Sequence, residues 1–231
     1  MENLNSYLKK YFYLKDAFPE HFKNTGRGIE VIADKEKLTS LIERLKIQFH
    51  EKGFPKCWAE IGVFYEDPYL WFVRDLIRFS DGTLNTHHRI IRKDKGLTGV
   101  AFLGVYKGKI VMLNHFRHPA RKSFLEIPRG GIIEGKTPEE TIIEEVYEEI
   151  YGKIKSLIKL EKINPSTSID TSSVLCFYGE YESIGNPSLS EGIIEVLSFT
   201  VKEVETMIKN GVITDAITIC SFLHAKLRDL L

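Results

Sequence analysis

Apolar residues near the start of the chain recur with the spacing of an α-helix. Residues 2–14 and 35–50 both follow this period, which predicts two helices. In the second, the apolar positions form one stripe: Leu38, Leu41, Ile42, Leu45 and Ile47. Gly53-Phe54-Pro55 then interrupts the chain, and residues 57–91 are rich in aromatic and β-branched side chains. We therefore expect strands there, with a hairpin turn at Asp81-Gly82.

A second block of strand-like sequence begins near Thr98. Residues 100–105 and 109–113 flank Tyr106-Lys107-Gly108, which predicts a hairpin, and residues 124–127 predict a short strand. Further strands are expected over 156–163, 173–181 and 193–200. Helices are expected over 201–209 and 215–230, the last capped by Thr214. Strands interrupted by one helix and followed by two more indicate an α/β or α+β fold.

The interrupting helix is the most informative segment. Thr137, Pro138 and Glu140 form a helix start with a capping box, and the helix should end near Gly152. Glu145, Glu148 and Glu149 are spaced i, i+3 and i+4, so they share one face. The apolar residues of the helix lie on the opposite side: Ile142, Ile143, Val146 and Ile150.

Three carboxylates on one helix edge repel one another, which costs roughly a few tenths of a kcal/mol of helix stability per pair. Such an edge is either a solvated acidic surface or a site for a hard cation. Oxygen ligands of this kind suit Mg²⁺ or Mn²⁺ rather than Zn²⁺. A glycine-containing turn at Gly130 and Gly131 precedes the helix, and a strongly basic segment precedes the turn. These neighbours favour the metal site.

Residues 125–152 resemble a Nudix box, whose pattern is G-x5-E-x7-R-E-U-x-E-E-x-G-U, with U aliphatic. Gly130 fits the opening glycine, and residues 145–149 fit the central E-U-x-E-E in one register. Residues 109–130 are similar to the strand, Phe-Arg and Glu-Ile-Pro-x-Gly arrangement of the ADP-ribose pyrophosphatase branch. The likeness covers roughly residues 95–231, and residues 1–55 lie outside it.

This resemblance implies a Nudix α/β/α sandwich over residues 96–231, preceded by an extension. The extension divides into a helical part, 1–55, and a β-rich part, 56–95, that is expected to form a homodimer. By the same resemblance, the enzyme would need Mg²⁺ or Mn²⁺. It would cleave the diphosphate of a nucleoside diphosphate linked to another group, with ADP-ribose or a nucleotide sugar as the first candidates. The products would be a nucleoside monophosphate and a second phosphorylated compound.

The resemblance also assigns roles to individual residues. The metal ligands would be Glu145, Glu148, Glu149 and the main-chain carbonyl of Arg129, with Glu148 also acting in catalysis. Glu191, before the late strand, is the nearest candidate for the general base, although its spacing is off by one; it is otherwise an exposed loop acid. Three further residues are candidates for binding substrate: Arg117, Glu126 and Arg129.

Arg117 and Arg129 are candidates because arginine binds phosphate through two parallel hydrogen bonds. For Arg117 the alternative is a surface salt bridge. Glu126 would either support the metal site or pair with a neighbouring arginine. Trp58 and Trp71 are expected in a core or a dimer interface.

Three positions depart from the box. Lys136 replaces the first glutamate, Glu144 replaces the arginine, and Tyr151 replaces the late glycine. In the family, that arginine orients the glutamate beside it, which Glu144 cannot do. The alternative function is therefore a catalytically impaired Nudix domain that binds a nucleotide or a protein partner.

The composition of the chain limits the classes of partner that it is expected to bind. The chain has 32 Lys and Arg against 32 Asp and Glu, which argues against a dedicated nucleic-acid binder. No apolar run is long enough for a membrane span, and no signal peptide is evident at the N-terminus. Three widely spaced cysteines are typical of a cytoplasmic protein. We expect a small-molecule nucleoside diphosphate derivative as the partner.

The zero net charge conceals a segregation. Residues 86–130 contain ten Lys and Arg against two acids, whereas residues 131–151 contain seven glutamates against one lysine. A basic segment beside an acidic helix suits a diphosphate bound together with a metal ion.

Overall fold

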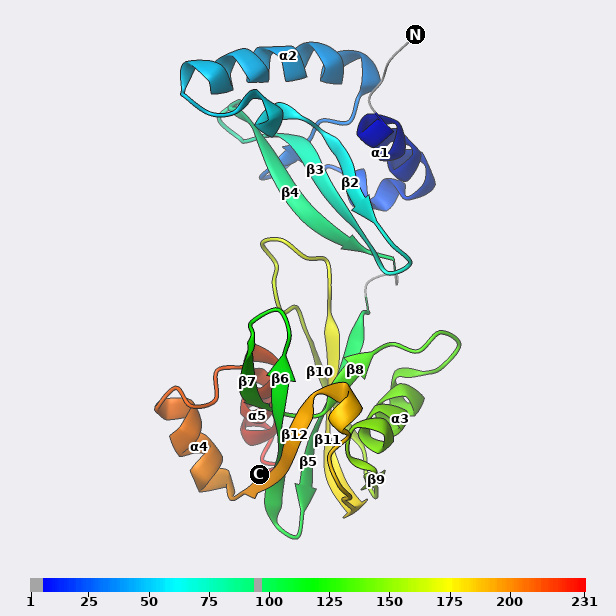
Figure 1. Cartoon of the computed structure of the whole chain (residues 1–231), viewed down its shortest axis with the longest axis vertical. Helices are drawn as coiled ribbons and strands as arrows, with labels where there is room; N and C mark the ends of the chain where they lie inside the picture. The colour runs from blue at the N-terminus through cyan, green and yellow to red at the C-terminus, as the bar shows by residue number, and fades with distance from the viewer. Residues whose placement is uncertain (1–5, 94–96) are drawn as a thin grey trace. The chain divides into compact units, whose positions relative to one another are not determined.

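The computed structural model describes residues 6–93 and 97–231, and it divides into two compact units (Figure 1). Unit 1 comprises residues 1–93 and 166–171, and unit 2 comprises residues 94–165 and 172–231. The predicted start of the first helix at residue 2, together with Asp94 and Lys95 of the basic segment, lies outside the described residues.

Unit 1 is built from helices and an antiparallel sheet. Its helices and 3-10 turns are α1 (Ser6–Ala17), η1 (Pro19–Phe22), α2 (Lys35–Glu51) and η2 (Lys56–Ala59). Its strands are β1 (Glu30–Val31), β2 (Gly62–Glu66), β3 (Leu70–Arg78) and β4 (Leu84–Arg92). Strand β3 is central, because β1, β2 and β4 all pair with it. The predicted turn at Asp81-Gly82 is confirmed, since it joins β3 to β4.

One hydrophobic core holds unit 1 together. Leu8, Tyr11 and Leu14 of α1 pack in the same cluster as Trp71 and Val73 of β3. The predicted stripe of α2 is also there, with one error: Ile47 is 60% exposed, and Phe49 is buried instead. The loop at 166–171 belongs to this unit because Asp170 forms a bridge with Ile90 of β4.

Unit 2 contains one mixed sheet with the strand order β10-β11-β5-β6-β12. These strands are β5 (Gly99–Tyr106), β6 (Lys109–Arg117), β10 (Ile158–Ile163), β11 (Val174–Ser183) and β12 (Ile193–Phe199). Three shorter strands extend the sheet: β7 (Lys122–Glu126) beside β6, β8 (Arg129–Gly131) beside β5, and β9 (Lys153–Ile154) beside β11. Strands β5 and β11 are parallel, whereas the other pairs are antiparallel.

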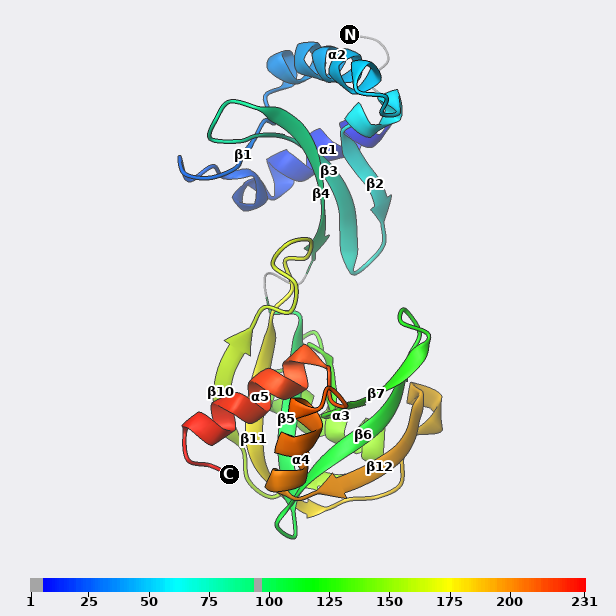
Figure 2. The ribbon, with the colours of Figure 1, turned by 90° about the vertical axis from the view of Figure 1, so that its left-hand side faces the viewer.

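Helices cover both faces of this sheet. Alternate residues of a strand point to opposite faces, so Phe102 and Val111 pack against α3 (Pro138–Ile150), whereas Ala101 and Ile110 pack against the C-terminal helices. Those helices are α4 (Val201–Lys209) and α5 (Ala216–Leu227). Figure 2 shows them on one side of the sheet and α3 on the other. The expected α/β/α sandwich is therefore confirmed.

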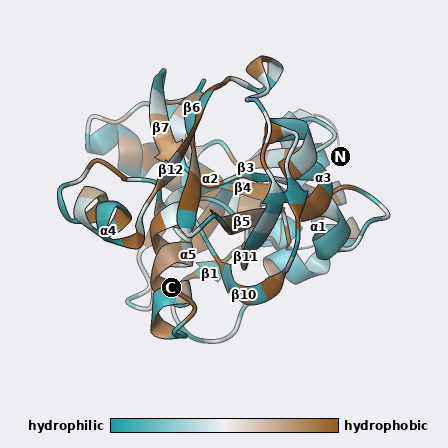
Figure 3. Ribbon diagram, turned by 90° about the horizontal axis from the view of Figure 1, so that it is seen from below, coloured by the Kyte–Doolittle hydropathy of each residue, from teal (hydrophilic) through white to brown (hydrophobic). Residues whose placement is uncertain are grey.

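In unit 2, a predicted hairpin turn and a predicted helix occur in the structure, and one predicted helix cap does not. Lys107 and Gly108 form the predicted hairpin turn, both with positive φ. Helix α4 occurs over the predicted residues 201–209, and its ribbon carries both hydrophilic and hydrophobic colours in Figure 3. One cap prediction is wrong: α5 is capped by Asp215, not Thr214, because the Asp215 carboxylate accepts a hydrogen bond from the Thr218 N–H.

Among the residues that the structure describes, no helix has the length and apolar character needed to span a bilayer.

Candidate active site

Helix α3 presents an acidic edge because its other side is fixed in the core. Its N-terminus has the predicted capping box, in which Thr137 and Glu140 exchange hydrogen bonds. Ile142, Val146 and Ile150 are fully buried against the sheet. That packing sets the rotation of the helix and so the direction of its glutamates. Glu145 is half-buried, Glu149 is buried, and Glu148 is exposed.

Gly130 allows the closest approach between α3 and the preceding turn. A Cβ atom at this position would lie 1.9 Å from the carboxyl carbon of Glu145, so no larger residue fits without displacing that side chain. The opening glycine of the box therefore has a structural reason here. It lets the Glu145 carboxylate lie directly against the β8 backbone.

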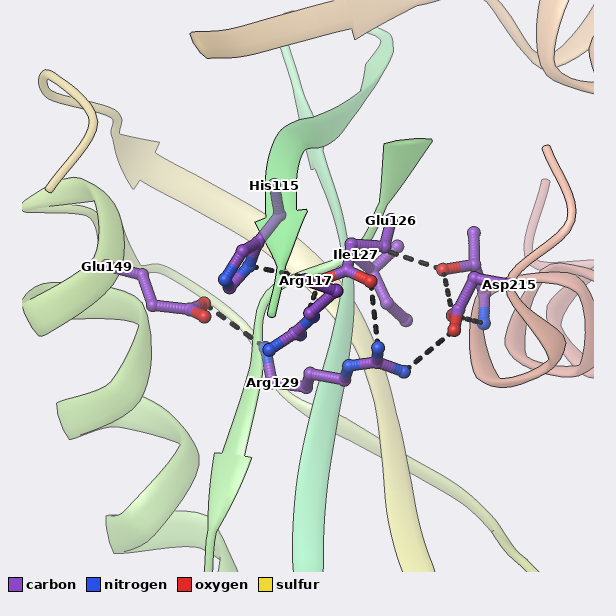
Figure 4. A network of polar contacts seen from close by, with 8 residues as sticks. His115, Arg117, Glu126, Ile127, Arg129, Glu149 and Asp215 are labelled. Carbon is purple, nitrogen blue, oxygen red and sulfur yellow. Dashed lines mark hydrogen bonds and ion pairs between the residues drawn. The ribbon is translucent and has the colours of Figure 1, made fainter. Parts of the chain in front are cut away.

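Glu149 is anchored to the same turn. Its Oε2 accepts a hydrogen bond from the Arg129 backbone N–H at 3.1 Å (Figure 4). Burial, together with the neighbouring Glu145 charge, raises the pKa of Glu149 to about 8. Burial, together with the charges of Glu148 and Glu191, raises the pKa of Glu145 to about 7. Both carboxylates, Glu145 and Glu149, are therefore held where burial and neighbouring negative charge make ionisation unfavourable.

Glu191 lies at the end of the short turn η3 (Leu189–Glu191), which leads into β12. The following Gly192 is in the left-handed region, and its carbonyl accepts a hydrogen bond from the Phe116 N–H of β6 at 2.9 Å. Glu191 is exposed, and its charge acts on Glu145. The late loop therefore brings a fourth glutamate towards the acidic edge.

Glu126 is the centre of a buried ionic network (Figure 4). Its carboxylate pairs with Arg117 of β6, with the Arg129 Nη2 at 2.8 Å and with the His115 Nδ1 at 3.0 Å. Only 1% of the Glu126 side chain is exposed, against 30% for Arg117 and 19% for Arg129. Glu126 therefore lies behind the two guanidinium groups and holds them, while the arginines retain the exposed surface.

The network continues to a residue that the sequence reasoning missed. The Arg129 Nη1 binds the Asp215 carboxylate at 2.9 Å, and Asp215 also accepts hydrogen bonds from the N–H and the hydroxyl of Thr218. The Thr218 hydroxyl in turn accepts the Ile127 N–H at 3.1 Å. Asp215 thus caps α5 and orients Arg129 simultaneously. Its position before a helix was a visible signal, but its partner lies 86 residues away.

The two charged departures from the box form an ion pair with each other. Lys136 binds the Glu144 carboxylate. The box has an acid and then a base at these positions, whereas this chain has a base and then an acid. The third departure, Tyr151, is the C-cap of α3 and adopts a left-handed conformation at φ 49°, which is the backbone conformation that glycine favours.

The donor set at the acidic edge fits a hard divalent cation. Glu145 and Glu149 are carboxylates that a cation would stabilise in their ionised form, and oxygen ligands suit Mg²⁺ and Mn²⁺. Within residues 6–93 and 97–231, no three acidic, histidine or cysteine side chains already converge into a metal site. Glu145 and Glu149 lie against residues 129–130, whereas Glu148 is exposed on the same face of the helix.

Two comparisons with known proteins agree with this geometry. The chain is 29% identical over 136 residues to ADP-ribose pyrophosphatase of Bacillus subtilis (strain 168), an alignment that covers 57% of this chain and 74% of that enzyme. A crystal structure of an ADP compounds hydrolase superposes with a TM-score of 0.63 over 74% of this chain and 95% of its own. At 12% identity, this second match shows a shared fold. No family model matches the sequence.

The acidic helix behind its glycine turn, the sandwich fold and the sequence likeness point the same way: the chain resembles the Nudix hydrolases of the ADP-ribose pyrophosphatase branch.

Proposed function

We propose that this enzyme is a metal-dependent hydrolase of a nucleoside diphosphate linked to another group, with ADP-ribose as the first candidate and a nucleotide sugar as the second. Water would attack one phosphorus atom of the diphosphate, and the bridging P–O bond would break. The products are a nucleoside monophosphate and a second phosphorylated compound; from ADP-ribose these are AMP and ribose 5-phosphate. The similarity to ADP-ribose pyrophosphatase supports this choice of substrate.

The observation that carries the proposal is the pair of buried carboxylates on α3. Glu145 and Glu149 are held against residues 129–130, and both have a pKa raised towards or above neutrality. When both carboxylates are ionised, such a pair destabilises the fold unless a cation neutralises it. Such a pair is expected where the protein binds a divalent cation as part of its function.

The ligands would be Glu145, Glu148, Glu149 and the main-chain carbonyl of Arg129. Bound Mg²⁺ or Mn²⁺ supplies charge neutralisation for the diphosphate oxygens and acidifies the attacking water. Glu148, as the exposed member of the set, is also the residue that we place nearest to the reacting water. We assign Glu191 as the general base, because its loop approaches the acidic edge and its charge reaches Glu145.

Arg117 and Arg129 would bind the diphosphate. Both guanidinium groups remain partly exposed while Glu126 and Asp215 fix their orientation from behind. Binding substrate with arginines that are already ordered costs less conformational entropy than ordering free side chains. In this proposal Glu126 acts on the substrate through the arginines that it positions.

A substrate panel tests the function directly. The purified full chain is incubated with Mg²⁺ or Mn²⁺ and with ADP-ribose, nucleoside diphosphate sugars and dinucleotides, and products are identified by mass spectrometry. Glu149→Gln should lower kcat by about a hundredfold or more, because it removes a charge from the metal site. The matched control is Glu161→Gln, an exposed position on β10, which should leave kcat unchanged. Failure to hydrolyse any member with either metal contradicts the proposal.

We also propose a homodimeric, cytoplasmic enzyme. The β-rich segment 56–95 would form the dimer contact, since it exposes large aromatic side chains at Tyr65 and Tyr69. A cytoplasmic location is in keeping with the free thiols of Cys57, Cys176 and Cys220. Native mass measurement and fractionation of cells test these two points separately.

A further inference from the structure

Unit 1 contains a hollow that the proposed hydrolase site does not use. It lies where the C-terminal end of α2 and the turn η2 meet strand β3 and the β3–β4 hairpin, and its volume is about 500 Å³. We call it the α2 pocket and define it by Lys52, Phe54, Trp58, Arg74, Thr86 and His88. Ligand pockets typically have volumes of roughly 300–1,000 Å³, so this one is large enough for a small molecule.

One wall of the α2 pocket is aromatic. The rings of Phe54 and Trp58 are stacked at a centroid distance of 5.2 Å, and Phe54 contacts the buried Phe49 edge-on at 6.0 Å. Trp58 is nevertheless 47% exposed and Phe54 44% exposed. Of the two expected locations for the tryptophans, a core or a dimer interface, Trp71 is in the core, whereas Trp58 is not. An exposed, ordered tryptophan face is suited to stacking on a planar ring.

Three basic residues stand among the neutral residues of the remaining wall. Arg74 of β3 and His88 of β4 are direct cross-strand partners, and Lys52 lies at the end of α2. Among the described residues that line the α2 pocket there is no aspartate or glutamate. The charge of the pocket is therefore complementary to an anion, and arginine and lysine together favour phosphate.

Hydrogen bonds fix the aromatic wall in advance. The Arg74 Nη1 donates to the Cys57 carbonyl oxygen at 3.0 Å, and the Thr86 hydroxyl donates to the Trp58 carbonyl oxygen at 3.1 Å. Both bonds tie the turn η2 to the sheet. A ligand would consequently not have to order this turn when it binds, which lowers the entropic cost of binding.

We propose that the α2 pocket binds a small molecule in which an aromatic ring is joined to a phosphate, that is, a mononucleotide. The ring would stack on Trp58, and the phosphate would lie near Lys52, Arg74 and His88. The limited volume and the zero net charge of the chain favour a mononucleotide over a polynucleotide. This site lies wholly within unit 1, so it is additional to the hydrolase site and does not depend on the proposed substrate.

Binding of AMP to the full chain tests the proposal. The titration is carried out in EDTA, so that metal-dependent binding at α3 does not contribute, and is followed by tryptophan fluorescence and calorimetry. AMP should quench Trp58, whereas adenosine and inorganic phosphate, which each supply half of the interaction, should bind at least about tenfold more weakly. Trp58→Phe should remove the quenching but retain most of the affinity.

Variants separate this site from any other. Trp58→Ala and Lys52→Glu should each weaken AMP binding by about tenfold or more, and Lys52 is exposed, so its substitution should not disturb folding. The matched control is Lys9→Glu, the same charge change at an exposed position on α1, which should change the affinity less than about twofold. Undiminished AMP binding by Lys52→Glu and Trp58→Ala overturns the proposal. Much tighter binding of a ten-nucleotide single strand than of AMP would overturn it in favour of a nucleic-acid surface.

Discussion

The charge state of Glu145 and Glu149 links metal binding to the stability of the protein. Their pKa values, about 7 and about 8 in the folded state, exceed the ordinary value of 4.5, because burial and neighbouring carboxylates disfavour ionisation: Glu148 and Glu191 act on Glu145, and Glu145 and Glu126 act on Glu149. The charge of Arg117 opposes this shift at Glu149 without cancelling it. Raised folded pKa values mean that the folded state holds protons that the unfolded state has already released.

Stability without metal should therefore fall as pH rises from about 4.5 to about 8, and then level off. Urea unfolding of the full chain in EDTA, repeated across this range, measures the slope. Glu149→Gln should flatten it, and Mg²⁺ should stabilise the protein most at the alkaline end, where the carboxylates are ionised. A metal-free stability that rises through this range would contradict the assignment.

The position of Glu126 behind two arginines makes it a second sensitive residue. Glu126→Ala leaves the Arg117 and Arg129 guanidinium groups without their shared buried partner, and breaking a buried pair typically costs roughly 3–5 kcal/mol. We expect the free energy of unfolding, measured in urea, to fall by an amount of that order. We also expect a raised KM for the substrate. Glu161→Ala, at an exposed position on β10, is the control and should change stability by less than about 0.5 kcal/mol.

Among single residues, the sequence predicted relative positions that depend on local spacing. Gly130, Glu145 and Glu149 could be found because helical periodicity and the box fix their relation to one another. Asp215 could not, because its bond to Arg129 joins residues 86 positions apart. For the same reason, the sequence left the role of Glu126 open between a metal site and an ion pair. Such long-range partners depend on the tertiary fold, which local patterns do not specify.

Among the elements, helices were predicted well where a capping signal and apolar periodicity coincide, and hairpins where a turn signal separates two strand patterns. The capping box at Thr137 and the turn at Lys107-Gly108 are local signals, and both occur in the structure as expected. Ile47 is exposed because it lies only two residues after Leu45, so it falls off the helix face that the buried residues form: Leu38, Ile42, Leu45 and Phe49. The N-cap of α5 falls on Asp215 rather than Thr214, since the carboxylate reaches the N–H of Thr218.

The ion pair between Lys136 and Glu144 can be tested by reversing its charges. Lys136 and Glu144 carry the opposite charges from the box pattern and bind each other, so a single reversal places two like charges together. Lys136→Glu or Glu144→Arg should lower kcat by about tenfold, because either shifts Glu145 beside the metal site. The double variant Lys136→Glu/Glu144→Arg restores an attractive pair and should recover kcat to within about threefold.

The control for this cycle is another exposed ion pair of unit 2. The Lys155 Nζ and the Glu180 Oε2 lie 2.6 Å apart, and both residues lie outside the box. Their single and double reversals should leave kcat unchanged, and exposed pairs of this kind change stability by only about 0.2–1 kcal/mol. If the double variant at positions 136 and 144 stays as slow as the single ones, the pair does not position Glu145.

Over the whole chain, the sequence predicted the layers but not the order of the strands. Alternating strands with one helix between them indicated a sandwich, and cores on both faces of the unit 2 sheet confirm it. The parallel pairing of β5 with β11 joins segments about seventy residues apart, and the loop at 166–171 is counted with unit 1. No periodic pattern encodes either feature. The segregation of charge, by contrast, was visible in the sequence and corresponds to the glutamates of α3 and the arginines of β6 and β8.

The proposed homodimer can be tested at two exposed tyrosines of unit 1. Tyr65 and Tyr69 lie four residues apart around the β2–β3 turn and are 56% and 73% exposed, so they offer aromatic surface to a partner. If residues 56–95 form the dimer contact, light scattering should give a mass of about 53 kDa, twice the 26.6 kDa of one chain. Tyr69→Arg should then shift the protein towards the monomer, because it introduces a charge into an apolar contact. Tyr13→Arg, at an equally exposed aromatic residue on α1, should leave the dimer intact. A monomeric mass for the unmodified chain at micromolar concentration would exclude this interface, and dimer loss in both variants would place the contact elsewhere in unit 1.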